Sequence, residues 1–120
     1  MKYFLDTHAL IEIAEGSPKY EKYLESDTAT LKDNLAELFY FLLKKYDVKT
    51  ANFFLEKFAR LAVELPIEVI SKAMSFRYNN IKKGLSYIDC FGCTYAVENK
   101  MSFLTGDRAF EGMKGVELVR

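Results

Sequence analysis

The sequence has no excess charge of either sign, because 17 basic side chains balance 17 acidic ones in 120 residues. A neutral chain has no overall attraction to nucleic acid or to a membrane surface, so any such binding must come from a local patch. Cysteine is scarce as well: Cys90 and Cys93 cannot build the disulfide scaffold of a small secreted protein and fit a reducing compartment. No apolar run approaches the roughly 18 residues of a membrane-spanning helix, so we expect no membrane partner.

Features that would divide the chain or export it are absent too. There are two prolines, no internal repeat and no low-complexity segment that would mark a linker. The N-terminus lacks the long uncharged stretch of a signal peptide, since Asp6, His8 and Glu12 interrupt it. With 50% apolar residues, the length suits one domain with its own core. We expect a single cytoplasmic domain over residues 1–120.

The sequence does contain short apolar stretches that alternate with helix-like patterns. Strands are predicted at Lys2–Leu5, Thr28–Leu31, Ala62–Leu65, Ser102–Thr105 and Val116–Val119. Helices are predicted at Thr7–Ala14, Lys19–Glu25, Asp33–Tyr46, 51–61, 66–82 and Ser86–Asn99, the longer ones from apolar residues at helical spacing. Short apolar strands separated by helices indicate an α/β fold, with a parallel sheet that is covered on both faces.

Two acidic residues directly follow predicted strands. Asp6 follows the first strand, and Asp107 follows the segment "SFLTG". In parallel sheets, ligands bind beyond the carboxyl ends of the strands, near a switch in strand order. Each residue also has a purely structural interpretation, because Asp is a good helix N-cap and Thr-Gly-Asp is typical of a turn.

Two further acids lie on predicted helices. Asp89 is the only charged residue in "SYIDCFGCTYAV", a helix whose apolar residues lie all round it, which predicts that Asp89 is largely buried. The spacing Ser86-x-x-Asp89 also matches a capping box, and the two interpretations are compatible. Glu37 lies off the apolar stripe of its helix, on the side of Asn34, and taken alone it is a surface residue.

Taken together, the four acids predict a metal site. If Asp6, Glu37, Asp89 and Asp107 converge, their charges repel by roughly 4 kcal/mol per pair at about 4 Å, so the cluster needs protons or a cation. Oxygen ligands without histidine or cysteine favour the hard ions Mg²⁺ or Mn²⁺. Such ions lower the pKa of bound water and stabilise charge on phosphoryl oxygens, so the chemistry indicated is phosphodiester hydrolysis.

The sequence resembles a PIN domain of the small VapC-like kind. The matching segments are "FLDTHALI", "NLAELF", "SYIDCFGCTYA" and "FLTGDRAF", which occur in the family's order and cover nearly the whole chain. The resemblance implies a three-layer α/β/α sandwich with a central parallel sheet. It also implies a metal-dependent endoribonuclease, the toxin of a toxin–antitoxin pair, with an antitoxin protein and a second copy of the chain as partners.

The resemblance also assigns roles to individual residues. It implies that Asp6, Asp89 and Asp107 hold one Mg²⁺ or Mn²⁺ and that Glu37 orients a water for in-line attack on RNA. Asn34 and Thr105 match polar positions that support the pocket. Many members carry a further acid two residues after the last one, where this chain has Ala109, and this departure leaves a second metal open.

RNA contacts are predicted from basic residues. Between Ser71 and Ile88 the chain carries no acidic residue, and its basic residues are Lys72, Arg77, Lys82 and Lys83. Basic side chains bind phosphates, and the aromatic residues between them can stack on bases. The alternative is an ordinary solvated helix face. Arg108, next to Asp107, is a further candidate for a substrate phosphate.

The cysteines, the single histidine and three aromatic residues allow more than one interpretation. Cys90-x-x-Cys93 lies inside an apolar helix and indicates two buried small residues rather than a redox site. His8 is the single histidine and could edge the pocket near Asp6. Tyr40, Phe41 and Phe53 lie off their apolar stripes and could mark a dimer or antitoxin contact. Two alternatives to a toxin are an inactive PIN-like module that binds RNA or protein and a housekeeping RNA-processing nuclease.

Overall fold

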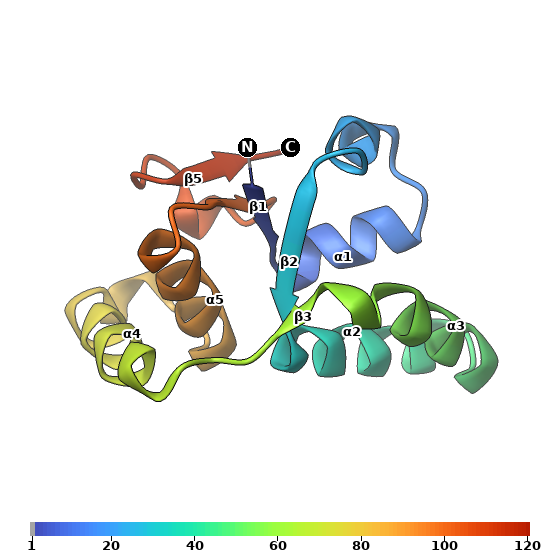
Figure 1. Cartoon of the computed structure of the whole chain (residues 1–120), viewed down its shortest axis with the longest axis horizontal. Helices are drawn as coiled ribbons and strands as arrows, with labels where there is room; N and C mark the ends of the chain where they lie inside the picture. Colours follow the sequence, from blue (N-terminus) through green and yellow to red (C-terminus); the bar gives the residue numbers. More distant parts are fainter. Residues whose placement is uncertain (1) are drawn as a thin grey trace.

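The computed structural model describes residues 2–120 and contains one five-stranded sheet over that range (Figure 1). The strands are β1 (Lys2–Leu5), β2 (Asp27–Leu31), β3 (Ala62–Val63), β4 (Ser102–Thr105) and β5 (Val116–Leu118). All neighbouring strands pair in parallel, in the order β3-β2-β1-β4-β5. The predicted parallel sheet is therefore confirmed, with β3 shorter than expected and at the edge, beside the proline that follows it.

The α-helices are α1 (Thr7–Ala14), α2 (Lys32–Lys45), α3 (Val48–Phe58), α4 (Ile67–Asn79) and α5 (Tyr87–Glu98). Four 3₁₀ helices join them within residues 2–120: η1 (Pro18–Tyr23), η2 (Ala59–Leu61), η3 (Ile81–Lys83) and η4 (Arg108–Phe110). Among these residues, no helix is both long and apolar enough to cross a membrane.

Three helix predictions need correction. The helix predicted over 51–61 ends at Phe58, and the chain continues as η2. The segment predicted as a helix over Lys19–Glu25 is the 3₁₀ helix η1, in which residues three apart eclipse one another, and Tyr20 and Tyr23 are both buried at that spacing. The helix predicted over 66–82 ends at Asn79. The side-chain amide of Asn80 donates to the carbonyl of Phe76 at 2.8 Å, which competes with the helical hydrogen bonds, and η3 follows.

Successive residues of the central strands contribute alternately to two separate hydrophobic cores. Leu5 and Leu104 belong to a core with α1, η1, α2 and α3, whereas Phe4 and Phe103 belong to a core with α4 and α5. Neighbouring residues of a strand point to opposite faces of the sheet, so both faces are apolar and both are covered. In Figure 1, α1, α2 and α3 lie on one side of the sheet and α4 and α5 on the other, which confirms the three-layer α/β/α sandwich.

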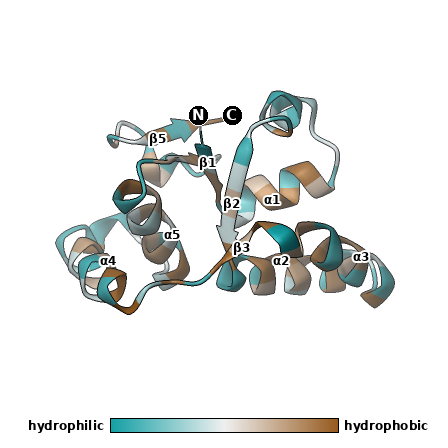
Figure 2. Ribbon diagram, viewed as in Figure 1, coloured by the Kyte–Doolittle hydropathy of each residue, from teal (hydrophilic) through white to brown (hydrophobic). Residues whose placement is uncertain are grey.

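The helices carry hydrophobic and hydrophilic bands in alternation, as expected when one face of a helix packs on the sheet (Figure 2). Helix α5 comes closest to the strands. A Cβ atom at Gly92 would lie 2.7 Å from the Phe4 ring, so only glycine allows this approach. Cys90 and Cys93 are buried free thiols in the same helix, which confirms their interpretation as small core residues.

The strand order places a topological switch at β1. The chain runs outward from β1 through β2 to β3, and then returns to the other side of β1 as β4. At such a point the connections leave β1 and β4 in opposite directions, which opens a crevice at their carboxyl ends. The register pairs Leu5 with Leu104, so Asp6 and Thr105 lie at the same edge of the sheet.

Candidate functional site

Asp6 lies at the centre of this edge. Its side chain is 3% exposed and caps α1, with Oδ1 accepting from the backbone N–H of Ala9 at 2.8 Å. The hydroxyl of Thr105 bonds to the same carboxylate. Asp6 therefore has the capping role predicted for it. A helix-capping side chain is normally exposed, whereas the Asp6 carboxylate is buried near the end of β4.

The surroundings of Asp6 raise its pKa to about 7. Burial is the main cause, and the negative charges of Asp89 and Asp107 raise it further, while the hydrogen bonds from Thr105 and Ala9 oppose the shift. The structure therefore brings Asp89 and Asp107, two of the other three predicted acids, within electrostatic reach of Asp6. A carboxyl group that titrates near neutral pH is typical of a functional site.

Asp107 is joined to Asp6 through Thr105. The Thr105 hydroxyl accepts from the backbone N–H of Asp107 at 3.0 Å and bonds to the Asp6 carboxylate. Asp107 itself is exposed and caps η4, its Oδ1 accepting from the N–H of Ala109 at 2.9 Å. The predicted turn and cap are therefore present, and Thr105 connects two of the candidate acids.

Asp89 approaches from the opposite layer of helices. It forms the predicted capping box, in which the Ser86 hydroxyl accepts from the N–H of Asp89 and Asp89 Oδ2 accepts from the N–H of Ser86, each at 3.0 Å. The expectation that Asp89 is largely buried is wrong: the side chain is half-buried, because the first turn of α5 reaches the rim of the sheet.

Glu37 is half-buried and tied to the site by a chain of side-chain bonds that sequence reasoning missed. The hydroxyl of Thr7 donates to Glu37 Oε1 and accepts from the side-chain amide of Asn34 at 3.1 Å. Asn34 is 2% exposed, and its Oδ1 has no hydrogen-bond partner among residues 2–120. An orphaned acceptor therefore lies on Asn34, whose side-chain amide bonds to Thr7, the residue that follows Asp6. The only sequence signal was the i, i+3 spacing of Asn34 and Glu37.

The donor set fits a hard divalent cation. Asp89 and Asp107 each use one carboxylate oxygen in a cap, which leaves the other oxygen for a ligand. The orphaned Asn34 oxygen adds an acceptor that a hydrated ion could satisfy. Within residues 2–120 no three candidate ligands already stand close enough to hold a metal. Like-charged carboxylates repel in the absence of a cation.

The basic residues predicted to contact RNA include Lys82, Lys83 and Arg108, and all three are exposed. Lys82 and Lys83 lie exposed in η3, and within residues 2–120 neither side chain makes a hydrogen bond or ion pair. Lys83 lines a pocket whose lining contains none of the four acids. Arg108 is likewise exposed beside Asp107. Arg77 is engaged elsewhere, since its Nε donates to the Leu85 carbonyl at 3.1 Å.

Together the sheet, its switch point and the acids at its carboxyl edge define an α/β protein with a polar site at the ends of β1 and β4. The family model of the PIN domain matches residues 3–116. The chain belongs to the PIN domain family.

Solved structures share this fold across nearly the whole chain. DNA-bound VapBC from Salmonella typhimurium is 21% identical, with a TM-score of 0.78, and the match covers 98% of this chain and 96% of that one. VapBC2 from Rickettsia felis, bound to a promoter DNA fragment, is 18% identical with a TM-score of 0.77 and full coverage of both chains (100%). VapC20 from Mycobacterium tuberculosis, a sarcin–ricin loop cleaving toxin, is 14% identical with a TM-score of 0.76 and covers 98% and 99%. None of the curated proteins matches the chain in sequence.

Proposed function

We propose that residues 1–120 form a single PIN domain that acts as an endoribonuclease dependent on Mg²⁺ or Mn²⁺. The observation that carries the proposal is the buried Asp6 carboxyl, whose pKa is raised by burial and by Asp89 and Asp107 at the carboxyl edge of the sheet. Burying the Asp6 carboxylate next to two further acids is unfavourable, and fold stability alone gives no reason to place them together.

Asp6, Asp89 and Asp107 are the residues that would hold the cation. When bound, it would stabilise the negative charge that develops on phosphoryl oxygens and lower the pKa of water. Asp6 must be deprotonated to serve as a ligand, so its raised pKa couples metal affinity to pH. The Thr105 hydroxyl holds the Asp6 carboxylate in one orientation and fixes the backbone of Asp107 beside it.

Glu37 is placed to orient the attacking water. Its Oε1 is held by the Thr7 hydroxyl, so the other carboxylate oxygen keeps a defined direction and can accept a proton from a water. The Asn34 oxygen offers a second acceptor for the same water. Because Asn34 donates to Thr7 and Thr7 donates to Glu37, these three side chains act as one unit that positions the base.

The structural neighbours support a toxin role with an antitoxin partner. One is a toxin–antitoxin complex from Klebsiella pneumoniae, another is a member of the VapBC family of toxin–antitoxin systems from Mycobacterium tuberculosis, and VapC20 is a sarcin–ricin loop cleaving toxin. A pocket of about 520 Å³ opens between α1 and α2, and its lining runs from Thr7 and Glu37 along Ile11, Tyr40 and Phe41 to Lys44 and Lys45. We propose that an antitoxin segment docks in this pocket and covers Glu37. The exposed Phe53, at 59%, is a candidate contact in the expected homodimer.

The activity is tested by incubating the purified protein with total RNA and Mg²⁺ and sequencing the new ends. We expect discrete cuts by the wild type and none by Glu37→Gln, which keeps the shape of the side chain but cannot accept the proton. Glu56→Gln, an exposed glutamate on α3, is the matched control and should cut as the wild type does. Equal cutting by the wild type and Glu37→Gln would contradict the assigned role.

A further inference from the structure

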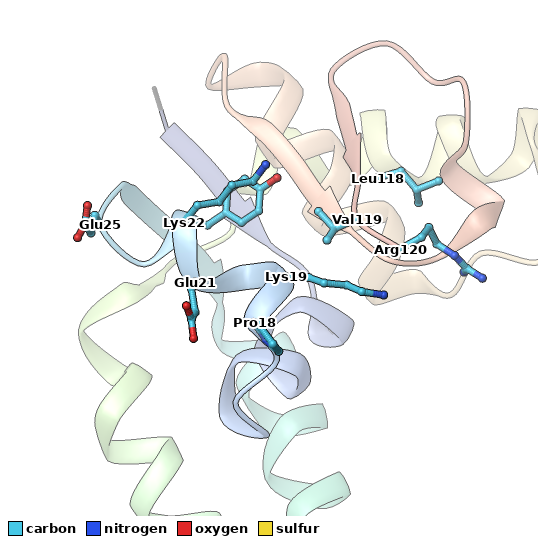
Figure 3. A pocket seen from close by; sticks show the side chains of 9 residues that line it. Pro18, Lys19, Glu21, Lys22, Glu25, Leu118, Val119 and Arg120 are labelled. Atoms are coloured by element: carbon cyan, nitrogen blue, oxygen red, sulfur yellow. The ribbon is translucent and has the colours of Figure 1, made fainter.

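A second pocket lies beside the candidate site, between α1, η1 and the segment after β5. Its volume is about 270 Å³, and it is lined by His8, Glu12, Lys19, Tyr20, Gly106, Val119 and Arg120. It adjoins a more open pocket with which it shares Lys19, Val119 and Arg120. Figure 3 shows Lys19 reaching from η1 toward Val119 and Arg120. No residue of this pocket has a role in the proposed chemistry.

The pocket contains a buried donor that has no acceptor. Tyr20 is 2% exposed, and its hydroxyl has no hydrogen-bond partner among residues 2–120. Leaving such a group unpaired costs roughly 1–3 kcal/mol, so it calls for an explanation. Burial raises the pKa of this phenol, and the charges of Asp6 and Glu12 add to the shift, so the hydroxyl keeps its proton. An acceptor brought by a ligand would satisfy it.

The other polar groups of the pocket are mainly donors and cations. Arg120 spends one N–H on the Gly106 carbonyl at 2.8 Å, and its remaining N–H groups are available. Lys19 is exposed and makes no ion pair within residues 2–120. Of the residues that the structure describes, Glu12 is the one acid that lines the pocket. Its carboxylate lies 3.6 Å from the His8 ring, and a protonated ring would offset part of the negative charge of Glu12. The balance favours an anion with several acceptor oxygens, as a phosphate has.

The pocket is adjacent to the acids. Gly106 lies between Thr105 and Asp107, and the His8 ring packs so tightly on Gly106 that an added Cβ would lie 2.3 Å from its Nε2. The charge of Asp6 reaches the Tyr20 phenol. The pocket and the candidate acids therefore share the Thr105–Asp107 segment, so one ligand could contact both.

We propose that the pocket formed by Tyr20, Lys19 and Arg120 binds a phosphate of the RNA strand next to the scissile one. This inference rests on the proposed nuclease function and adds to it a second contact that fixes how the strand lies across the acids. The Tyr20 hydroxyl donates to the phosphate, and the two cations neutralise its charge.

The test measures binding of a short fluorescein-labelled oligouridine by anisotropy at several salt concentrations. All proteins carry Glu37→Gln so that the RNA stays intact. The variants are Tyr20→Phe and Lys19→Ala. The matched controls are Tyr23→Phe and Lys22→Ala, which lie in the same 3₁₀ helix but do not line this pocket. Melting temperatures are recorded for each protein without RNA.

We expect Tyr20→Phe and Lys19→Ala each to weaken binding about tenfold, as for the loss of one hydrogen bond to a charged group. Lys19→Ala should also lower the salt slope by about one. Tyr20→Phe should melt no lower than its parent, because its hydroxyl has no partner to lose. Tyr23→Phe should melt lower, because it loses the bond to Glu117, and should bind RNA as before.

Four outcomes would overturn the inference. Unchanged RNA binding by both Tyr20→Phe and Lys19→Ala would show that the pocket does not contact a phosphate. The proposed nuclease function would still hold in that case if the wild type cuts RNA. A lower melting temperature for Tyr20→Phe would mean that the hydroxyl already has a partner. Binding of inorganic phosphate that depends on Lys19, with unchanged RNA binding, would assign the pocket to a free anion. If no protein binds RNA, the proposed function fails together with the inference.

Discussion

The two helical layers place the candidate acids in different ways. In the α1 layer, formed by α1, η1, α2 and α3, Glu37 reaches the site through the hydroxyl of Thr7, 30 residues earlier in the chain. In the α5 layer, formed by α4 and α5, Asp89 is placed by a local capping box with Ser86, three residues away. The orientation of Glu37 therefore depends on one long-range hydrogen bond, whereas the position of Asp89 depends on where the whole of α5 lies.

Because of this difference, mutations in the two layers should affect stability and catalysis to different extents. In the α1 layer, removing one hydroxyl should disturb Glu37 while the core remains intact, because Thr7 is only half-buried. In the α5 layer, the position of Asp89 follows from the packing of Gly92 on Phe4, so a change that moves the helix alters stability and the site together. Asp6 lies at the edge of the sheet, and its pKa is raised by Asp89 of the α5 layer and by Asp107, which follows β4.

The largest expected effect is the dependence of stability on pH that comes from Asp6. Between its ordinary pKa of 3.8 and the folded value of about 7, the folded protein holds a proton that the unfolded chain has released. The contribution of Asp6 to the free energy of unfolding should therefore be largest below pH 3.8. It should fall as the pH rises to about 7, by up to about 4 kcal/mol in all. Urea unfolding at a series of pH values measures the fall.

Asp6→Asn should flatten this dependence while keeping the cap of α1, because Asn is an equally good N-cap. Asp47→Asn is the matched control, since Asp47 caps α3 away from the site and its own pKa is lowered, first by its bond to the Thr50 backbone. The control should retain the fall in stability toward neutral pH. A flat profile for the wild type would contradict the burial of an ionisable Asp6.

The next effect concerns the α5 layer. Gly92→Ala places a methyl group 2.7 Å from the Phe4 ring, so α5 or the buried ring must shift, and we expect a loss of about 1–3 kcal/mol in the free energy of unfolding. Val97→Ala, at a position that is 52% exposed on the same helix, should change stability by less than about 0.5 kcal/mol. Equal losses would mean that the close approach of α5 to β1 is not what holds this layer.

A smaller effect on stability, with a clear effect on chemistry, is expected in the α1 layer. Thr7→Val removes the hydroxyl that joins Asn34 to Glu37 and should cost about 1 kcal/mol in stability. RNA cutting should fall more than tenfold, because the base loses its orientation. Thr7→Ser should restore cutting, and Thr28→Val, at a half-buried position of β2, should leave it unchanged.

The smallest effect is expected at the capping box. Ser86→Ala removes one of its two bonds and should cost about 0.5–1 kcal/mol by thermal unfolding. Asp89 should remain near Asp6, because Gly92 still holds α5 against the sheet. Cutting should therefore fall less than for Thr7→Val. A larger fall at Ser86 than at Thr7 would reverse the comparison between the two layers.

The sequence predicted the elements and their parallel arrangement because both follow from local patterns. Apolar spacing marks a helix or a strand wherever it occurs, and Asp6 and Asp107 follow strands that run in the same direction. Their proximity could therefore be expected before the strand order was known. The capping box of Ser86 and Asp89 is a local motif and was visible for the same reason.

What could not be predicted depends on contacts between distant segments. Glu37 read alone as a surface residue, and only its bond to Thr7 connects it to the site. Tyr20 belongs to a segment predicted as an ordinary helix, and nothing local indicated that its hydroxyl would be buried and unpaired. Lys82 and Lys83 form an obvious basic pair in sequence, yet within residues 2–120 they make no hydrogen bond or ion pair.

The most direct test of the account is a calorimetric titration of Mn²⁺ into the wild type, Asp89→Asn and Asp47→Asn at a pH above 7, where Asp6 is ionised. The account predicts that the wild type and Asp47→Asn bind the ion alike, and that Asp89→Asn binds at least tenfold more weakly. Equal binding by all three proteins, or none by any, would contradict the claim that Asp6, Asp89 and Asp107 meet around one cation.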